Sequence, residues 1–238
     1  MRSVVVYANQ QAVADATGAR LGVALSDVIA QRGVAHVVLT GGTVGIGLLA
    51  SLASSPLVGL IDWTSVHVWW GDERFVGARD ADRNEGQAQR VLLGIVPLPE
   101  ENIHRMGSAD EFPTAESAAA AYAAEVAAHG TPAWDVLLLG VGPDGHVASL
   151  FPGHPVYAAA DLVEAVAVHD SPKPPPNRVS LSLASINRAR EVWVVAAGEA
   201  KAAAVSGGLA GDKNLPVAAV AGTERTLWLI DASASTEI

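Results

Sequence analysis

Apolar residues gather in short runs that recur along the whole chain. Many runs are continuous rather than alternating, which is typical of strands buried on both faces of a largely parallel sheet. The runs that predict strands are SVVVYA (3–8), HVVLT (36–40), SVHVWW (65–70), WDVLLLG (134–140), LVEAVAV (162–168), RVSLSL (178–183), EVWVVAA (191–197) and TLWLI (226–230). Ala-rich segments with helical spacing predict helices over 10–32, 84–93 and 115–130. This alternation predicts an α/β fold, a doubly wound, mostly parallel sheet with helices on both faces.

Length and composition narrow the class of protein. The 238 residues, half of them apolar, fit one domain over residues 1–238, although the length alone also allows two. No apolar stretch approaches the ~20 residues of a membrane helix, and the N-terminus lacks the long apolar region of a signal peptide. The absence of cysteine excludes disulfides, thiolate nucleophiles and cysteine-based metal sites. We therefore expect a cytoplasmic protein with no membrane partner.

The charge balance bears on the ligand. The net charge is −10 with only 15 Lys and Arg, which argues against nucleic-acid binding. If the ligand is an anion, the few cations must gather where it binds, because the field of the whole chain repels it. Arg178 opens the run RVSLSL, and Lys201 follows EVWVVAA near the start of a further predicted helix. Each alone is more often a solvated surface charge, but together they could form a phosphate pocket.

A glycine-rich turn follows the run HVVLT. Gly41 and Gly42 predict a tight turn, with a helix beginning near Thr43. Free backbone N–H groups at a helix start form an anion site, and Thr43 adds a hydroxyl donor. The turn lacks the Gly-Lys-Ser/Thr of a Walker A loop. A phosphate site and a turn without a ligand fit the residues equally well.

Three charged residues follow the run SVHVWW. Asp72, Glu73 and Arg74 stand at the end of that predicted strand. Neighbouring residues of a strand point to opposite sides, so at most two of the three face one cleft. The alternative is a local surface ion pair.

The segment GVGPDGHVASLFPGH concentrates Gly, Asp and His after a predicted strand. Residues 140–145 match G-x-G-x-x-G, with Asp170 as the possible acidic partner, but Asp144 and His146 fit a dinucleotide loop poorly. His146 is predicted at a helix start, which would keep its ring neutral and able to act as a general base. A capping or simply exposed histidine is the alternative. Asp144, His146 and His154 lack a zinc spacing, so no metal site is predicted.

These strings together resemble a known family. LTGG, GDER, RNEG, LLLGVGPDGHVASLFPG, PKPPPNRVSLSL and GEAK resemble the 6-phosphogluconolactonases, which form one superfamily with the glucosamine-6-phosphate deaminases. The resemblance covers nearly the whole chain and outranks the dinucleotide match. It implies a Rossmann-like fold without dinucleotide binding, and hydrolysis of 6-phospho-D-glucono-1,5-lactone to 6-phospho-D-gluconate, the second step of the oxidative pentose phosphate pathway. It also implies no metal and no cofactor, and a phosphorylated sugar lactone as the partner.

The resemblance also implies roles for single residues. His146 matches the catalytic histidine, and Arg74 of GDER should face the substrate. The positions that hold the phosphate in the superfamily correspond to Gly42, Thr43, Arg178 and Lys201. Either Asp72 or Asp144 could orient His146. We expect a monomer, with a dimer as the alternative.

Three other functions are alternatives to this one. In deaminases an Asn-Glu pair follows Asp-Gly-His, and a tyrosine or similar residue replaces Arg74, whereas this chain has no acidic residue over 148–151. A nicotinamide-dependent dehydrogenase would rest on the glycine spacing of 140–145 alone. A sugar-phosphate-sensing regulatory domain would need a DNA-binding helix-turn-helix, and no basic two-helix segment precedes residue 36.

Overall fold

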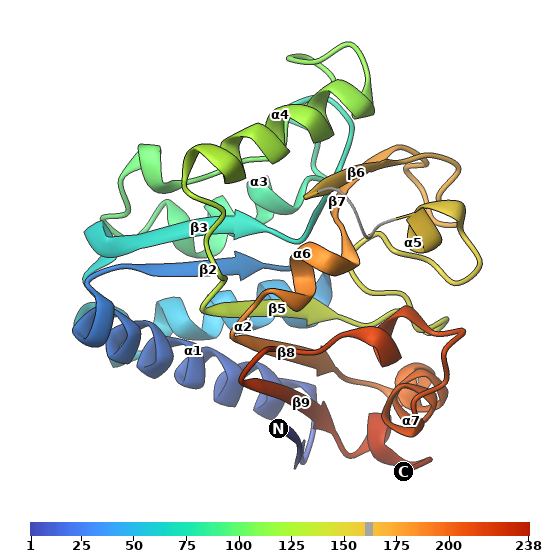
Figure 1. Ribbon diagram of the computed structural model, residues 1–238. Helices are drawn as coiled ribbons and strands as arrows, with labels where there is room; N and C mark the ends of the chain where they lie inside the picture. Colours follow the sequence, from blue (N-terminus) through green and yellow to red (C-terminus); the bar gives the residue numbers. More distant parts are fainter. Residues whose placement is uncertain (160–163) are drawn as a thin grey trace.

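The centre of the fold is a six-stranded sheet in the order β1-β9-β8-β5-β2-β3. The computed structural model describes residues 1–159 and 164–238. Every pairing in this sheet is parallel, and the arrowheads of its strands point the same way in Figure 1. The strands are β1 (Arg2–Tyr7), β2 (Ala35–Leu39), β3 (Val66–Trp70), β5 (Val136–Gly140), β8 (Glu191–Ala196) and β9 (Arg225–Asp231). The predicted mostly parallel α/β sheet is therefore confirmed.

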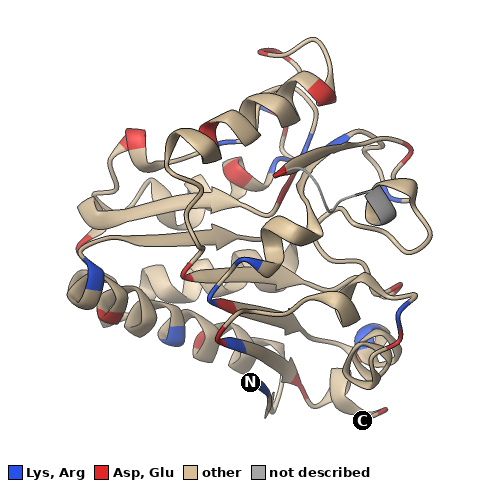
Figure 2. Cartoon of the chain, viewed as in Figure 1, with Lys and Arg blue, Asp and Glu red and all other residues tan. Residues whose placement is uncertain are grey.

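The central strands are buried on both faces, as their continuous apolar runs predict. β5 (VLLLG) is buried at four of its five positions, and β2 and β3 carry no Lys, Arg, Asp or Glu. Figure 2 shows acidic and basic residues over helices and loops, and at strand ends. Large side chains, Trp69, Trp134 and Trp193 among them, fill the core beside the sheet. Because the central strands are apolar, the polar and charged side chains that could bind a ligand lie in the segments that follow the strand ends.

Helices cover the sheet where the Ala-rich segments predict them. The helices are α1 (Gln10–Arg32), α2 (Gly42–Ser54), α3 (Asn84–Ala88), α4 (Ala115–Ala128), α5 (Pro155–Ala159), α6 (Leu183–Asn187) and α7 (Ala202–Ala210). α1 begins with Asn9 accepting a hydrogen bond from the N–H of Ala12, and it ends at Gly33 with φ 81°. α1 packs along α2, while α4 lies on the other side, over β6 and β7 (Figure 1). The predicted helix over 84–93 forms as α3 followed by a π-helical turn, Gln89–Leu93.

A second, three-stranded antiparallel sheet stands beyond the carboxyl edge of the first. Its order is β4-β7-β6, formed by β4 (Asp72–Arg74), β7 (Arg178–Leu181) and β6 (Ala165–Val168). The runs 162–168 and 178–183 therefore do form strands, but in an antiparallel sheet of their own and not in the parallel one, and 162–163 lie outside the described residues. The reason is the short, proline-rich connection over 169–177, since a parallel crossover needs a dozen or more residues.

The two sheets meet where β3 ends. Gly71 links β3 directly to β4, and its carbonyl accepts a hydrogen bond from the N–H of Leu181 in β7, 2.8 Å long. The segments that follow β2, β3 and β5 therefore open onto the same space between the sheets. None of the helices among residues 1–159 and 164–238 has the length and apolar character needed to span a membrane.

Candidate active site

A cavity of about 180 Å³ lies at the carboxyl edge of the parallel sheet. It is lined by Thr40, Gly41, Gly42, Asp72, Arg74, Asn84, Gly140, Val141, Gly142, His146, Ala148, Lys173, Arg178 and Lys201. A second hollow of about 310 Å³ shares Gly41, Gly42 and Lys201 with it, and Thr43 lines this second one. Segments more than 150 residues apart in the sequence therefore meet at one place, as expected for the carboxyl edge of an open α/β sheet.

His146 and Asp144 form a hydrogen-bonded pair beside the cavity. Asp144 Oδ1 lies 2.5 Å from Nδ1 of His146. The carboxylate is the acceptor, so the proton sits on Nδ1 and the lone pair on Nε2. Burial lowers the pKa of His146, and its hydrogen bond to Asp144 opposes that shift without cancelling it. The ring is therefore neutral at pH 7 with one nitrogen able to take a proton.

No helix begins at His146, so that prediction is wrong. Residues 143–149 form turns, with a lone bridge between Val147 and Leu150. Gly145 has φ 80° and Ala148 has φ 48°, conformations that an α-helix does not contain. Burial, including contact with the Phe151 ring at 4.6 Å between centroids, is what keeps the imidazole neutral, and not a helix dipole.

The backbone at Gly142 lies directly against the imidazole. A Cβ added at Gly142 would stand 2.0 Å from Nδ1 of His146, so any side chain there would displace the ring. The N–H of Gly142 donates to the carbonyl of His146 over 2.9 Å, and the N–H of Gly145 donates to the carbonyl of Gly142 over 3.0 Å. Because these two N–H groups have partners inside the turn, they are not free to donate to a ligand in this conformation.

Asp72, Glu73 and Arg74 alternate in direction along β4. Asp72 and Arg74 line the cavity. Glu73 turns away from it and is buried, where it accepts hydrogen bonds from backbone N–H groups that include those of Asn84 and Glu85. Burial raises the pKa of Glu73 to about 7, although Arg83 and those donors oppose the shift. The expected division of the trio between two sides is confirmed, and the burial of Asp72 and Glu73 excludes a surface ion pair.

Asp72 is not the partner of His146. Its Oδ2 accepts a hydrogen bond from Ser149 Oγ at 2.6 Å and lies 3.9 Å from Nη1 of Arg178. The two aspartates that sequence reasoning left open therefore have different neighbours. Asp144 contacts the imidazole of His146, and Asp72 contacts Ser149 and Arg178.

Asn84 is a cavity residue that the sequence did not reveal. Its Oδ1 accepts a hydrogen bond from Nη1 of Arg74 over 2.8 Å, and its Nδ2 donates to the carbonyl of Asp72 over 2.9 Å. Gly41 approaches it so closely that a Cβ there would stand 1.9 Å from Asn84 Oδ1. The amide thus links β4 to the glycine turn. Nε of Arg74 is buried without a hydrogen-bond partner among the described residues.

Arg178 is buried and holds the proline-rich loop. Its Nε donates to the carbonyl of Pro175, and its Nη2 donates to the carbonyls of Lys173 and Pro174. Nη1 faces Asp72 and Ser149, and the side chain lines the cavity. Two of the three guanidinium nitrogens of Arg178 therefore bind the loop. These hydrogen bonds hold the loop where Lys173 lines the cavity. Lys173 was not predicted, and only its place in PKPPP could have indicated it.

Lys201 also lines the cavity. It ends a short helical turn after β8, at the start of α7. Burial and the neighbouring Lys173 lower the pKa of Lys201, and Asp144 opposes the shift. Two ammonium groups and two guanidinium groups thus surround a small cavity in a chain of net charge −10. Such a concentration of cations favours an anionic ligand.

The glycine turn forms the helix start that the sequence predicts. α2 begins at Gly42, where φ is 78°, and its N-cap residue Gly41 makes no side-chain hydrogen bond to the helix. A left-handed φ at Gly42 is costly for other residues, which explains the glycine. The N-terminus of α2 points its N–H groups and the positive end of its dipole toward the two hollows.

Comparison with known proteins decides the family. The family model for glucosamine-6-phosphate isomerases/6-phosphogluconolactonase matches residues 8–228. The chain belongs to this family. Over 99% of its length it is 48% identical to a 6-phosphogluconolactonase of Streptomyces coelicolor, of which it covers 94%. It is also 42% identical, over 99% of its length, to a 6-phosphogluconolactonase of Mycobacterium leprae, of which it covers 98%.

Solved structures of the family share the fold. The crystal structure of devB protein, at 32% identity, superposes with a TM-score of 0.86 over 100% of both chains. The structure of 6-phosphogluconolactonase from Trypanosoma brucei, at 28% identity, superposes with a TM-score of 0.86 over 100% of this chain and 99% of that chain. A monomeric glucosamine-6-phosphate deaminase superposes with a TM-score of 0.79 at 18% identity, which is a likeness in fold alone. The family fold is thus common to lactonases and deaminases, and the residues of the cavity must separate the two activities.

Proposed function

We propose that this chain hydrolyses 6-phospho-D-glucono-1,5-lactone to 6-phospho-D-gluconate. The observation that carries the proposal is the His146–Asp144 pair, joined at 2.5 Å beside a small cavity surrounded by cations. Relatives named 6-phosphogluconolactonase that match nearly the whole chain support it. The reaction adds water to the lactone carbonyl and breaks the ring ester bond, so it needs one base, an anion site and a stabilised oxyanion.

The phosphate of the substrate docks between the N-terminus of α2 and the cations. Gly42 and Thr43 offer backbone and hydroxyl donors, and Lys201 offers an ammonium without a hydrogen bond or ion pair to any described residue. A dianion there would relieve the unfavourable burial of Lys201. Binding energy from the remote phosphate then fixes the lactone carbonyl next to the histidine.

His146 removes a proton from the attacking water. Its Nδ1 donates to Asp144, which leaves Nε2 as the base and stabilises the imidazolium that forms. The imidazolium then returns this proton to the ring oxygen as the tetrahedral intermediate breaks down. No metal is required at any step.

Arg74 stabilises the oxyanion in this scheme. Its Nε has no partner among the described residues, while its Nη1 is fixed by Asn84. Arg178 and Lys173 contribute positive charge from the loop side. Because the guanidinium is held in place before the reaction, little reorganisation energy is needed when the negative charge develops on the oxygen.

The cavity distinguishes this reaction from deamination. Opening and deaminating an amino sugar phosphate need a further acid–base group near the ring. In the described part of the lining the only carboxylate is Asp72, and it is engaged by Ser149. Residues 148–151, which follow the histidine, are Ala, Ser, Leu and Phe. These observations favour the lactonase over its relative in the family.

The proposal is tested by offering both substrates to the purified protein. Freshly prepared 6-phosphogluconolactone is followed at low temperature, where spontaneous opening is slow, and glucosamine 6-phosphate is followed by ammonia release. We expect lactone hydrolysis well above the background and no ammonia. Ammonia release without lactone hydrolysis would overturn the proposal. A cytoplasmic location and a monomeric state, with a dimer as the alternative, stay predictions.

A further inference from the structure

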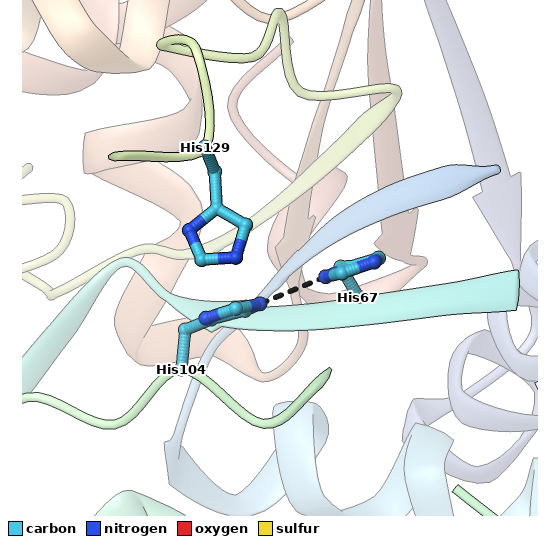
Figure 3. A group of neighbouring side chains, drawn as sticks. All are labelled: His67, His104 and His129. Carbon is cyan, nitrogen blue, oxygen red and sulfur yellow. Dashed lines mark hydrogen bonds between the residues drawn. The ribbon is translucent and has the colours of Figure 1, made fainter. Parts of the chain in front are cut away.

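Three histidines converge at the edge of the central sheet, away from the cavity. His67 lies on β3, His104 follows the 3-10 turn η4 (Glu100–Asn102), and His129 caps the C-terminus of α4. One ring nitrogen from each lies within 4.8 Å of the others. Figure 3 shows the His129 ring turned toward the gap between the other two rings. Three residues of β3 separate His67 from Gly71, so the cluster is roughly 13 Å along the strand from Gly71.

The hydrogen bonds around the cluster leave lone pairs facing its centre. His104 Nδ1 lies 2.9 Å from Glu125 Oε1, and His129 Nδ1 lies 3.0 Å from the carbonyl oxygen of Glu125. Both acceptors require a proton on Nδ1, so Nε2 of each ring carries a lone pair. His104 Nε2 faces Nδ1 of His67 at 2.9 Å. One residue, Glu125, thus fixes the tautomer of two rings.

The rings of His67 and His104 are held in the neutral form that binds metals. Burial lowers the pKa of His104 to about 4, even though Glu125 opposes the shift. Burial also lowers the pKa of His67. The rings of His104 and Trp69 stack at 3.7 Å between centroids, and that stacking fixes the orientation of the imidazole. A neutral imidazole whose Nδ1–H donates to a carboxylate is the arrangement of ligating histidines in metalloproteins.

We propose that His67, His104 and His129 bind one divalent transition-metal ion of the zinc class. The ligand atoms are His67 Nδ1 and the Nε2 atoms of His104 and His129. Imidazole nitrogens suit zinc, copper and nickel, whereas calcium and magnesium prefer oxygen. Three histidines leave a fourth position for water, because His129 lies at the surface.

The rearrangement needed to close the site is small. Zn–N bonds of ~2.0–2.1 Å at tetrahedral angles place ligand nitrogens roughly 3.4 Å apart. The pair His67–His104 already stands at 2.9 Å, and the widest separation in the cluster is 4.8 Å. His129 can supply the movement, since its side chain is 31% exposed and belongs to a helix end. The ion would take the place of the proton that Nδ1 of His67 donates to His104, and that proton would move to Nε2 of His67, so the ring stays neutral.

The ion would join three separate segments of the chain. β3 is an edge strand of the parallel sheet, and the segment after η4 contacts it through one bridge, between Val68 and Ile103. α4 arrives from the other side through Glu125 and His129. A shared ligand set would therefore stabilise the folded chain without taking part in the reaction at His146.

The site is tested with Zn²⁺ added to the untagged, chelator-treated protein, by calorimetric titration and thermal unfolding. We expect one Zn²⁺ per chain, and a rise in Tm of about 5–10 °C at a hundredfold excess over Kd. Co²⁺ at the same site should give the visible absorption of a tetrahedral complex. His129→Gln removes an exposed ligand and should weaken Zn²⁺ binding at least tenfold without harming the fold. His67→Gln should do the same, with circular dichroism as the check on folding.

Two variants provide matched controls. His169→Gln changes an exposed histidine bonded to Glu116 and Asn177, and His146→Gln changes the histidine of the cavity. Both should bind Zn²⁺ as the unmodified chain does. The proposal is overturned if the unmodified chain binds no Zn²⁺, or if His129→Gln binds it equally well. Loss of binding in His146→Gln instead would assign the ion to the cavity and would also overturn it.

Discussion

Asp144→Asn tests the pairing on which the histidine's role depends. The carboxylate can only accept from Nδ1 of His146, at 2.5 Å, and so it leaves Nε2 free as the base. An asparagine amide can accept in the same way, but it can also donate through its NH₂ group. In the second orientation the proton moves to Nε2 and the base is lost.

The size of the effect follows from the exposure of the pair. The side chain of Asp144 is 37% exposed, so water can replace part of what the carboxylate provides. The fully buried aspartate of a serine-protease triad contributes ~10⁴-fold to kcat. Losing a charge-assisted hydrogen bond of roughly 1.5–3 kcal/mol corresponds to about 10–10²-fold. We therefore expect kcat to fall by about 10²-fold, with folding retained.

The pH profile separates this effect from simple structural damage. Asp144 raises the pKa of His146 through its hydrogen bond and its charge, against the larger lowering by burial. Removing the carboxylate therefore lowers the pKa further. On the acid side of the pH profile, kcat/KM rises as His146 becomes neutral. In Asp144→Asn this inflection therefore moves to lower pH, and the plateau value of kcat/KM at higher pH falls. The assay is initial-rate lactone hydrolysis at low temperature, with the spontaneous rate subtracted at each pH.

Asp72→Asn is the matched control. Asp72 influences His146 only through its charge, the smallest of the causes that shift this pKa, because its Oδ2 accepts from Ser149. In Asp72→Asn the acid inflection of kcat/KM should move less than it does in Asp144→Asn. A larger shift in Asp72→Asn, or an unchanged plateau in Asp144→Asn, would refute the assignment of Asp144 as the residue that orients the base.

Three further outcomes are expected. Lys201→Ala should raise KM about tenfold or more with a smaller change in kcat, and an unchanged KM in steady-state kinetics would exclude a phosphate role. Gly142→Ala would put a Cβ 2.0 Å from His146 Nδ1, so kcat should fall ~10²-fold or more; near-normal turnover would show that the turn adapts. Chelator treatment should leave lactone hydrolysis intact even where it removes an ion from the histidine cluster, and activity that zinc restores would contradict a metal-free reaction.

The central sheet was predictable because its strands are continuous apolar runs. The second sheet was predictable only in part, because apolar runs predicted β6 and β7 but neither β4 nor the antiparallel pairing of the three strands. β4 has only three residues, Asp72–Arg74, and no apolar run marks it. Pairing with Arg178 and its neighbours in β7, more than 100 residues later, creates the strand. Such non-local pairing leaves no periodicity in the sequence.

The candidate site was found through residues whose types carry chemistry. His146, Arg74 and Lys201 stand after predicted strands, where an α/β sheet places its ligands. Asn84 and Lys173 were missed because an amide in a helix start and a lysine in a loop look like surface residues. The helix predicted at His146 does not form, because left-handed backbone at Gly145 and Ala148 produces turns instead.

The histidine cluster was invisible in the sequence for a different reason. The first two ligands, His67 and His104, are 37 residues apart, far from any local metal-binding spacing. Only the packing of α4 and the segment after η4 on β3 brings the rings together. Their lowered pKa values arise from that burial and have no counterpart in a linear pattern.

The most direct test of the account is the turnover of His146→Ala on 6-phosphogluconolactone. The variant removes the ring that lies against Gly142 and leaves the surrounding cations in place. We expect kcat to fall by 10²–10⁴-fold, about what a general base contributes, with KM changed little and the Tm within a few degrees. Turnover within a few-fold of the unmodified chain would contradict the central claim that His146 activates the water.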